Sequence, residues 1–246
     1  MPRPEDAPFG QPRGIEGLSG QNTPPSERLI RADFHNHTHY SPDSILAPKQ
    51  FVREVRRRGL TTAAITDHNT IRGALAVRDI ADFPIIIGEE VKSADGEILG
   101  LFLSEDIPRD LPASETIARI KHQGGIVGVP HPFDSLRSAL REDVLLAVID
   151  QIDFIEALNA RMVFSSHNDK ARAFASDRDL PVTAGSDAHS SWEVARVHVE
   201  LPPFEGPPDF IAALRQGRLA GRLSTPFVHL ISRYAYLRRA LGWKPK

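Results

Sequence analysis

Histidine and carboxylate side chains gather in a few short motifs of this sequence, where together they could bind metal ions. His35 and His37 lie two positions apart, a spacing that places both imidazoles on the same face of a strand. Further candidates stand in the motifs SPDS, TDHNT, GEE, PHP and GSDAH: Asp43, His68, Glu90, His131, Asp187 and His189. Imidazole and carboxylate without thiolate suit zinc, manganese or iron(II). The candidates outnumber the ligands of one ion, so they favour a cluster of two or three divalent metal ions.

The composition narrows the chemistry and the classes of partner. The chain has 246 residues, with ten histidines and no cysteine, which excludes disulfides, thiolate nucleophiles and iron–sulfur clusters. A net charge of −2 argues against a protein that mainly coats nucleic acid or membranes. The first residues lack the apolar stretch of a secretory signal, and no apolar run approaches the ~20 residues of a membrane span. We therefore expect a cytoplasmic protein with no membrane partner.

Short apolar segments alternate with helical patterns from residue 31 onward, and these elements must position the motifs. Residues 1–27 are rich in proline and glycine without helix or strand periodicity, so we predict a flexible tail, followed by one domain over residues 28–246. The expected strands are 32–35, 62–66, 84–90, 97–103, 126–130, 153–158 and 182–186. The expected helices are 49–58, 71–80, 113–123, 142–149, 166–178 and 210–216.

This alternation predicts the fold class. Several expected strands, such as 126–130, are continuously apolar, as expected when both faces of a sheet are covered. The pattern therefore predicts a parallel, barrel-like α/β fold, with 84–90 and 97–103 forming a hairpin within it. In such barrels functional groups collect at the carboxyl ends of the strands, where nearly all of the motifs above stand.

The motifs resemble those of the PHP family (polymerase and histidinol phosphatase), and they occur in the family's order. The resemblance runs from about residue 29 to residue 235 and is carried by the opening His35–Asp43, the pair Asp67–His68, the GEE motif, His131–Pro132 and the GSDAH motif. It implies a distorted seven-stranded (β/α) TIM-like barrel that holds a trinuclear metal centre and hydrolyses phosphate esters. The chain is similar to the stand-alone phosphoesterase branch.

The resemblance also implies a ligand set. One metal would be held by His35, His37, Glu90 and Asp187. Glu90 would bridge to a second ion, also held by His131, while Asp43, His68 and His189 would hold the third. Glu97 stands where many family members have a histidine, so it is a possible ligand.

The remaining polar residues suggest how a phosphate ester would react. Two or three divalent ions would generate hydroxide from a bridging water. Glu90 and Asp187 would therefore take part in catalysis through this metal-bound hydroxide. Arg161 is the candidate phosphate clamp, because a guanidinium matches phosphate oxygens bidentately. His39 either contacts substrate or lies in an exposed loop, and Glu156 is either a ligand or a group that orients one.

The function expected from these residues is metal-dependent phosphoesterase. The substrate would be a small phosphorylated metabolite, or the terminal phosphate of a nucleotide or short oligonucleotide, and no obligate protein partner is inferred. One alternative is a histidinol-phosphate phosphatase. An alternative of another class is a non-catalytic, metal-stabilised binding module.

The carboxyl-terminal stretch predicts one more helix. Apolar residues recur at helical spacing from Phe227 to Leu241, so we expect an amphipathic helix that packs this face on the barrel and turns Arg233, Arg238 and Arg239 outward.

Overall fold

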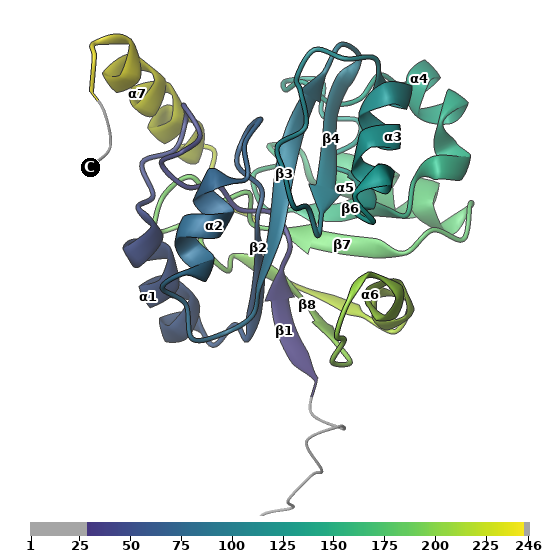
Figure 1. The fold of residues 1–246 in the computed structure, drawn as a ribbon, viewed down its shortest axis with the longest axis horizontal. Coiled ribbons are helices and arrows are strands. Elements are labelled where there is room, and N and C mark those ends of the chain that lie inside the picture. Colours follow the sequence, from purple (N-terminus) through teal and green to yellow (C-terminus); the bar gives the residue numbers. More distant parts are fainter. Residues whose placement is uncertain (1–28, 244–246) are drawn as a thin grey trace, which may run out of the picture.

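One curved nine-stranded sheet organises residues 29–243, the part of the chain that the computed structural model describes (Figure 1). The predicted tail, residues 1–27, lies outside the described residues. The strands are β1 (Ile30–Asp33), β2 (Thr62–Ile65), β3 (Ile85–Ser93), β4 (Gly96–Leu101), β5 (Ile126–Val129), β6 (Phe154–Asn159), β7 (Val182–Gly185), β8 (Val197–Leu201) and β9 (Arg218–Gly221). Their order in the sheet is β7-β6-β5-β4-β3-β2-β1-β8-β9.

Helices cover the outside of this sheet and lie close to the predicted ranges. They are α1 (Pro48–Arg58), α2 (Arg72–Arg78), α3 (Ala113–His122), α4 (Glu142–Ala147), α5 (Ser165–Ser176), α6 (Pro207–Leu214) and α7 (Val228–Ala240). Figure 1 shows α1 and α2 on one flank of the sheet and α3, α4 and α5 on the other. Within residues 29–243, no helix combines the length and the apolar character needed to cross a bilayer.

The sheet curls until the segment after β1 meets β7, which makes it a nearly closed barrel. The Phe34 amide donates to the Ala184 carbonyl (3.2 Å), and the Asp187 amide donates to the His35 carbonyl (2.8 Å). The His37 amide continues the ladder to Ala188 (2.9 Å). These bonds confirm the predicted barrel-like α/β fold and join the segments that carry three of the five candidate histidine ligands, His35, His37 and His189.

The described sheet is mixed and has two strands beyond the seven expected. The predicted hairpin is confirmed, since β3 and β4 pair antiparallel with Glu90 opposite Leu99. Strands β8 and β9 extend the sheet beyond β1 by antiparallel pairing. Strand β9 has the sequence RLAG and no buried residue, so it carries no hydrophobic signal and depends on pairing with β8.

Aromatic side chains pack together between α6 and the sheet. Phe210 on α6 packs edge-on against Phe34 (ring centroids 5.1 Å apart) and against Phe154 (6.1 Å). All three side chains are buried. Because this packing is apolar, the polar side chains that follow the strands gather apart from it.

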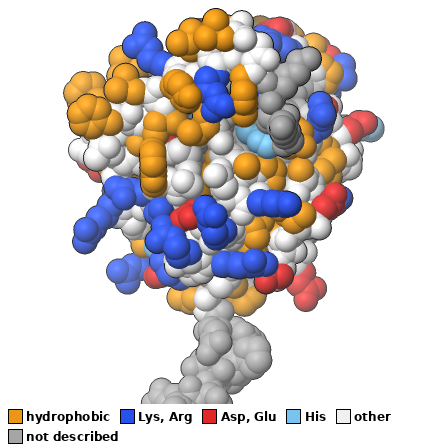
Figure 2. Space-filling model, turned by 90° about the vertical axis from the view of Figure 1, so that its left-hand side faces the viewer, with side chains coloured by type: hydrophobic (Ala, Val, Ile, Leu, Met, Phe, Trp, Pro, Cys, Tyr) orange, Lys and Arg blue, Asp and Glu red, His pale blue; other side chains and the backbone are white. Residues whose placement is uncertain are grey.

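The orientation predicted for the carboxyl-terminal helix is wrong. Phe227, Leu230 and Leu237 are exposed (76%, 58% and 58%), whereas Val228 and Ala235 are buried on α7. Arg239 turns toward the barrel and donates to the His39 carbonyl. The carboxyl end of the barrel offers carbonyls and charged groups, so the small and polar side of α7 packs there. Figure 2 shows the resulting hydrophobic area on the α1, α2 and α7 side, above a lower area rich in Lys and Arg.

Candidate metal centre

The predicted ligands come together at the carboxyl end of the barrel, one or two from each strand end. His35 and His37 follow β1, His68 follows β2, Glu90 on β3 and Glu97 on β4 come from one hairpin, and His131 follows β5. Asp187 and His189 follow β7, and Asp43 folds back from the loop before α1. All of these residues are buried except His68, which is partly buried. The strand ends therefore bring together residues that lie up to 154 positions apart (35 to 189).

Glu90 lies at the middle of the cluster. One carboxylate oxygen, Oε2, lies 3.2 Å from His37 Nε2, 3.4 Å from His35 Nε2 and 3.2 Å from His68 Nδ1. The other oxygen, Oε1, lies 3.0 Å from His131 Nε2. A carboxylate with imidazoles on both of its oxygens has the arrangement needed to bridge two ions.

Four overlapping groups of side chains could each hold an ion. In each group the ligand atoms lie within 4.8 Å of one another: His35–His37–Glu90, His35–His131–Asp187, His37–His68–His189 and His68–Glu90–Glu97. Asp43 adds a further carboxylate to the cluster, with Oδ2 2.9 Å from His189 Nε2 and 3.3 Å from His68 Nε2. Among residues 29–243, Asp43 Oδ1 and His131 Nδ1 are buried without a hydrogen-bond partner. Crowded nitrogen and oxygen donors with unpaired buried atoms fit divalent metal ions.

The pKa shifts within the cluster also fit the binding of metal cations. Burial alone would lower the pKa of His68, but the Asp43 and Glu90 carboxylates raise it to about 10. Burial raises the pKa of Glu97, and the charge of Glu90 raises it further. The carboxylates thus stabilise protons on neighbouring groups. The same negative charge would stabilise a bound metal cation.

Hydrogen bonds fix the ring orientation of His37. Ser41 Oγ donates its single proton to Asp67 Oδ1 (2.7 Å), so toward His37 Nδ1 (3.1 Å) it can only accept. His37 therefore carries its proton on Nδ1 and presents a free lone pair on Nε2 toward Glu90. This is the tautomer that a metal ligand needs.

Glu156 supports the cluster from behind. Its Oε1 lies 3.0 Å from His35 Nδ1, and its Oε2 accepts from the His131 amide (2.7 Å) and from Asn159 Nδ2 (3.0 Å). Both carboxylate oxygens are engaged on the far side of the His35 ring. Of the two roles left open by the sequence, this geometry favours the orienting group. Glu97, in contrast, lies 3.7 Å from His131 Nε2 and lines the cavity, as a ligand would.

Arg161 lines the site, but each of its guanidinium nitrogens already has a protein neighbour. Nη1 lies 2.6 Å from His189 Nδ1, Nη2 donates to Ser232 Oγ (2.9 Å) and to the Val228 carbonyl (3.2 Å), and Nε lies 3.2 Å from Glu193 Oε1. Burial and this guanidinium lower the pKa of His189 to about 4, so the imidazole stays neutral. Arg161 thus connects the site to α7.

His39 is not among the residues that line the cavity. Its ring packs beside Tyr40 (centroids 5.2 Å apart), and its carbonyl accepts from Arg239. Of the two alternatives for His39, the exposed loop is wrong, because the side chain is 9% exposed, and the substrate contact stays a prediction.

The sequence reading missed Arg137, Asn159 and Tyr236. Arg137 comes from the loop between β5 and α4 and pairs with Asp187 and with Asp134 (2.7 Å). Asn159 Nδ2 donates to Asp187 Oδ2 (3.1 Å). The available signal for Asn159 was its place at the end of β6, whereas Arg137 lies in a loop that carries no such signal. Tyr236 lies on α7, so its place at the site could not be predicted from its position relative to a strand end.

These side chains enclose a cavity of about 160 Å³. Its lining is Asp43, His68, Glu90, Glu97, His131, Arg137, Ser138, Arg161, Asp187, His189 and Tyr236. A larger cavity of about 530 Å³ lies elsewhere, near the start of β1, and is lined mainly by apolar residues such as Ile86, Phe102 and Phe204. It holds no cluster of titratable groups, so the chemistry belongs to the smaller one.

The chain matches two protein-family models and two curated relatives. The PHP domain model matches residues 33–141, and the PHP-associated model matches residues 165–219. The relatives are two uncharacterized proteins of Methanocaldococcus jannaschii. One is 37% identical over 141 residues, which cover 52% of this chain and 82% of the relative. The other is 32% identical over 199 residues, covering 76% and 79%.

Solved structures share the fold at lower identity. A two-domain protein from Bacteroides vulgatus, described as containing a predicted PHP-like metal-dependent phosphoesterase, aligns with a TM-score of 0.67 at 19% identity. The match covers 79% of this chain but 65% of that protein, so this chain spans less than two thirds of its length. PsfC from Pseudomonas syringae aligns at 0.63 and 18% identity, covering 87% and 99%. The lesion-specific endonuclease PfuEndoQ from Pyrococcus furiosus aligns at 0.59 and 16%, covering 80% and 60%. With the family match, the second relative and this fold taken together, the chain belongs to the PHP domain family.

Proposed function

We propose that this protein is a metal-dependent phosphoesterase. Its substrate would be a small phosphorylated metabolite, or the terminal phosphate of a nucleotide or short oligonucleotide. The observation that carries the proposal is the arrangement around Glu90, where imidazoles approach both carboxylate oxygens inside a cavity that also contains two arginines. Divalent ions bound there would lower the pKa of bound water and neutralise charge on phosphoryl oxygens.

The protein's own groups divide the remaining work. Glu90 and Asp187 sit between the histidines and keep the donor atoms of neighbouring strand ends within reach of one another. Ser41 and Glu156 hold the rings of His37 and His35 with Nε2 facing inward. Pre-positioned ligands lose little freedom on binding an ion, which raises metal affinity.

Arg137 is better placed than Arg161 to bind a phosphoryl oxygen. Both arginines line the cavity, and each of their guanidinium nitrogens has a protein partner, which for Arg137 are Asp134, Asp187 and Asn159. Arg137 is the more exposed of the two, at 19% of its side chain against 4% for Arg161. A guanidinium beside bound phosphate can donate two parallel hydrogen bonds. We therefore assign the phosphate contact to Arg137 and give Arg161 a supporting part.

Metal analysis combined with a substrate screen tests the proposal. We expect two or three divalent ions per chain after loading with manganese, zinc or iron(II). We also expect hydrolysis of at least one class among sugar phosphates, nucleotides, short oligonucleotides with terminal phosphate, and histidinol phosphate. His37→Ala and Asp187→Asn should each lower turnover by at least about 100-fold and reduce metal content. His122→Ala removes an exposed histidine of α3 and should change neither.

The outcomes separate the alternatives. Absence of divalent metal binding, even after reconstitution, would refute the proposed phosphoesterase function. Metal binding without turnover of any phosphate ester would favour the non-catalytic binding module. Turnover restricted to histidinol phosphate would identify the histidinol-phosphate phosphatase.

A further inference from the structure

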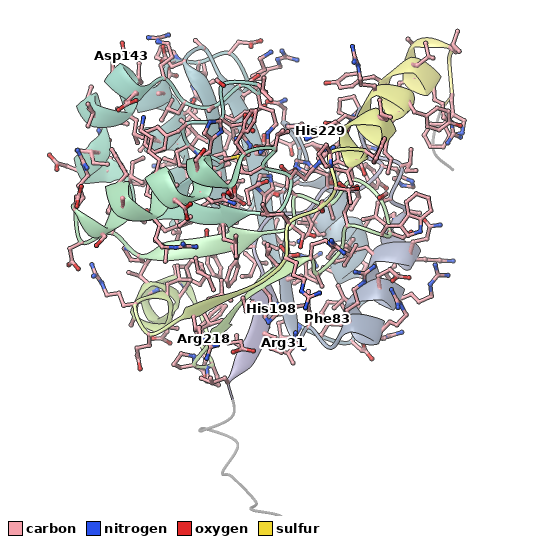
Figure 3. All side chains as sticks on the ribbon, turned by 180° about the vertical axis from the view of Figure 1, so that it is seen from behind. Arg31, Phe83, Asp143, His198, Arg218 and His229 are labelled. Atoms are coloured by element: carbon pink, nitrogen blue, oxygen red, sulfur yellow. The ribbon has the colours of Figure 1, made fainter. Side chains whose placement is uncertain are left out.

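Helix α7 is held across the carboxyl end of the barrel by hydrogen bonds at both of its ends. Near its start, Arg161 donates to Ser232 Oγ and to the Val228 carbonyl, while His229 Nε2 lies 3.1 Å from the Arg161 carbonyl. Figure 3 shows His229 where α7 meets the barrel. Near its end, Arg239 donates to the His39 and Ser41 carbonyls. The helix is therefore a fixed wall of the metal site.

Tyr236 lies between these two attachments and is the one residue of α7 that lines the cavity. It is 54% exposed, so its ring stands at the mouth rather than inside. The hydroxyl of a tyrosine has one proton that it can donate. Among residues 29–243 it has no hydrogen-bond partner, which leaves it free to donate to a bound molecule.

The cavity behind Tyr236 is too small for a whole substrate. Its volume is about 160 Å³, whereas small-molecule pockets usually hold about 300–1,000 Å³. The phosphoryl group fits inside, beside the ligands. The alcohol part of an ester must leave through the mouth and pass along α7.

We propose that Tyr236 is a specificity-determining residue for phosphomonoesters, a proposal that rests on the phosphoesterase function above. Its ring packs against the alcohol part of the substrate, and its hydroxyl donates a hydrogen bond to an oxygen of that part. Water replaces the alcohol at phosphorus, so the products are the free alcohol and inorganic phosphate. A phosphodiester carries a second alcohol arm, and the wall formed by α7 and Tyr236 leaves that arm less room.

Steady-state kinetics on the full chain loaded with manganese test this role. The substrates are p-nitrophenyl phosphate, a monoester, and bis(p-nitrophenyl) phosphate, a diester. For Tyr236→Phe we expect kcat/KM on the monoester to fall about 2- to 10-fold, from loss of one hydrogen bond. Tyr236→Ala should lower it about tenfold or more, mainly through KM, and should raise the ratio of diester to monoester activity.

A neighbouring tyrosine provides the matched control. Tyr234 is also exposed (53%) and on α7, but it lies against Arg238 (5.5 Å from the guanidinium carbon to the ring centroid) and does not line the cavity. Tyr234→Ala should therefore leave both activities unchanged. Inhibition by inorganic phosphate, which has no alcohol part, should be the same in Tyr236→Ala as in the wild type.

Four results would overturn the assignment. Tyr236→Ala could weaken phosphate inhibition as much as it raises KM, which would mean damage to the metal site. The two tyrosine variants could behave alike, which would mean that Tyr236 does not touch substrate. If the wild type hydrolyses the esters while the activity ratio stays constant in Tyr236→Ala, only this inference fails. If the metal-loaded wild type hydrolyses neither ester nor any substrate of the wider screen, the proposed function fails with it.

Discussion

Removing the Asp67 carboxylate should both destabilise the protein and weaken its metal binding. Asp67 is fully buried and accepts four hydrogen bonds: from the Thr38 amide (2.7 Å), Thr38 Oγ1 (2.7 Å), the Ser41 amide (3.2 Å) and Ser41 Oγ (2.7 Å). These bonds order the loop that carries His37 and Asp43. They also set the direction of the Ser41 hydroxyl, on which the His37 tautomer depends.

The magnitude follows from the number of bonds. Four hydrogen bonds at about 1 kcal/mol each give about 4 kcal/mol. Burial raises the pKa of Asp67, although His37 and the Thr38 and Ser41 hydrogen bonds lower it, so the buried carboxylate carries a cost that Asp67→Ala relieves. The net loss of unfolding free energy should be about 3 kcal/mol, or about 6–12 °C in Tm. Asp67→Asn keeps the three bonds to one oxygen and should lose about 1–2 kcal/mol.

Two measurements on the same preparations check this reasoning. Urea denaturation of the metal-free protein gives the unfolding free energy, and calorimetric titration with Mn²⁺ gives the metal affinity, which should fall about 10- to 100-fold in Asp67→Ala. Asp82→Asn is the control, because Asp82 is 67% exposed on its side chain and pairs with Arg56 on the surface. It should cost less than about 1 kcal/mol and leave metal binding unchanged.

A steric variant tests the same network without deleting a polar group. A Cβ at Gly73 would lie 1.8 Å from Asp67 Oδ2 and 2.4 Å from Thr38 Oγ1, so Gly73→Ala must displace the carboxylate. It should match Asp67→Ala in both assays. An Asp67→Ala variant within about 0.5 kcal/mol of the wild type would contradict a stabilising role for Asp67. A loss of stability without a loss of Mn²⁺ affinity would show that Asp67 does not position His37.

Three further predictions concern the barrel interior and the metal ions. A Cβ at Gly185 would lie 2.0 Å from Glu156 Oε1, so Gly185→Ala should push that carboxylate off the His35 ring and lower Mn²⁺ affinity in the same titration. At Gly128 a Cβ would lie 2.0 Å from the Phe154 ring, so Gly128→Ala should cost at least about 2 kcal/mol in urea denaturation while metal stoichiometry is kept. Chelation of the loaded protein should lower Tm by about 5–10 °C, as expected for metal at about 100 times its Kd, and an unchanged Tm would argue against a structured metal centre.

Much of the cluster could be predicted because its members are local features of strand ends. His35 and His37 share a face by strand periodicity, and Glu90 and Asp187 follow apolar segments that are recognisable on their own. The carboxyl ends of neighbouring barrel strands meet, so identifying the strands was enough to bring these residues together.

Other parts depend on contacts between distant segments. Arg137 reaches Asp187 from a loop with no periodic pattern, and β9 forms only because β8 provides an edge for it. The orientation of α7 was predicted wrongly from its apolar stripe, because the surface beneath it is polar and binds Arg239 instead. Hydrophobic periodicity reports an apolar face but not the surface that will receive it.

The amino-acid sequence by itself determined which donor atoms exist, in which order they follow the strands, and that they are nitrogen and oxygen without sulfur. Only the tertiary structure decided that Glu90 occupies the centre, that Ser41 and Glu156 orient two of the histidines, and that α7 brings Tyr236 to the mouth. The physical reason is the distance along the chain over which each effect acts. Strand periodicity acts over a few residues, whereas the tautomer of a histidine and the width of a cavity are set by groups that meet only after the barrel has closed.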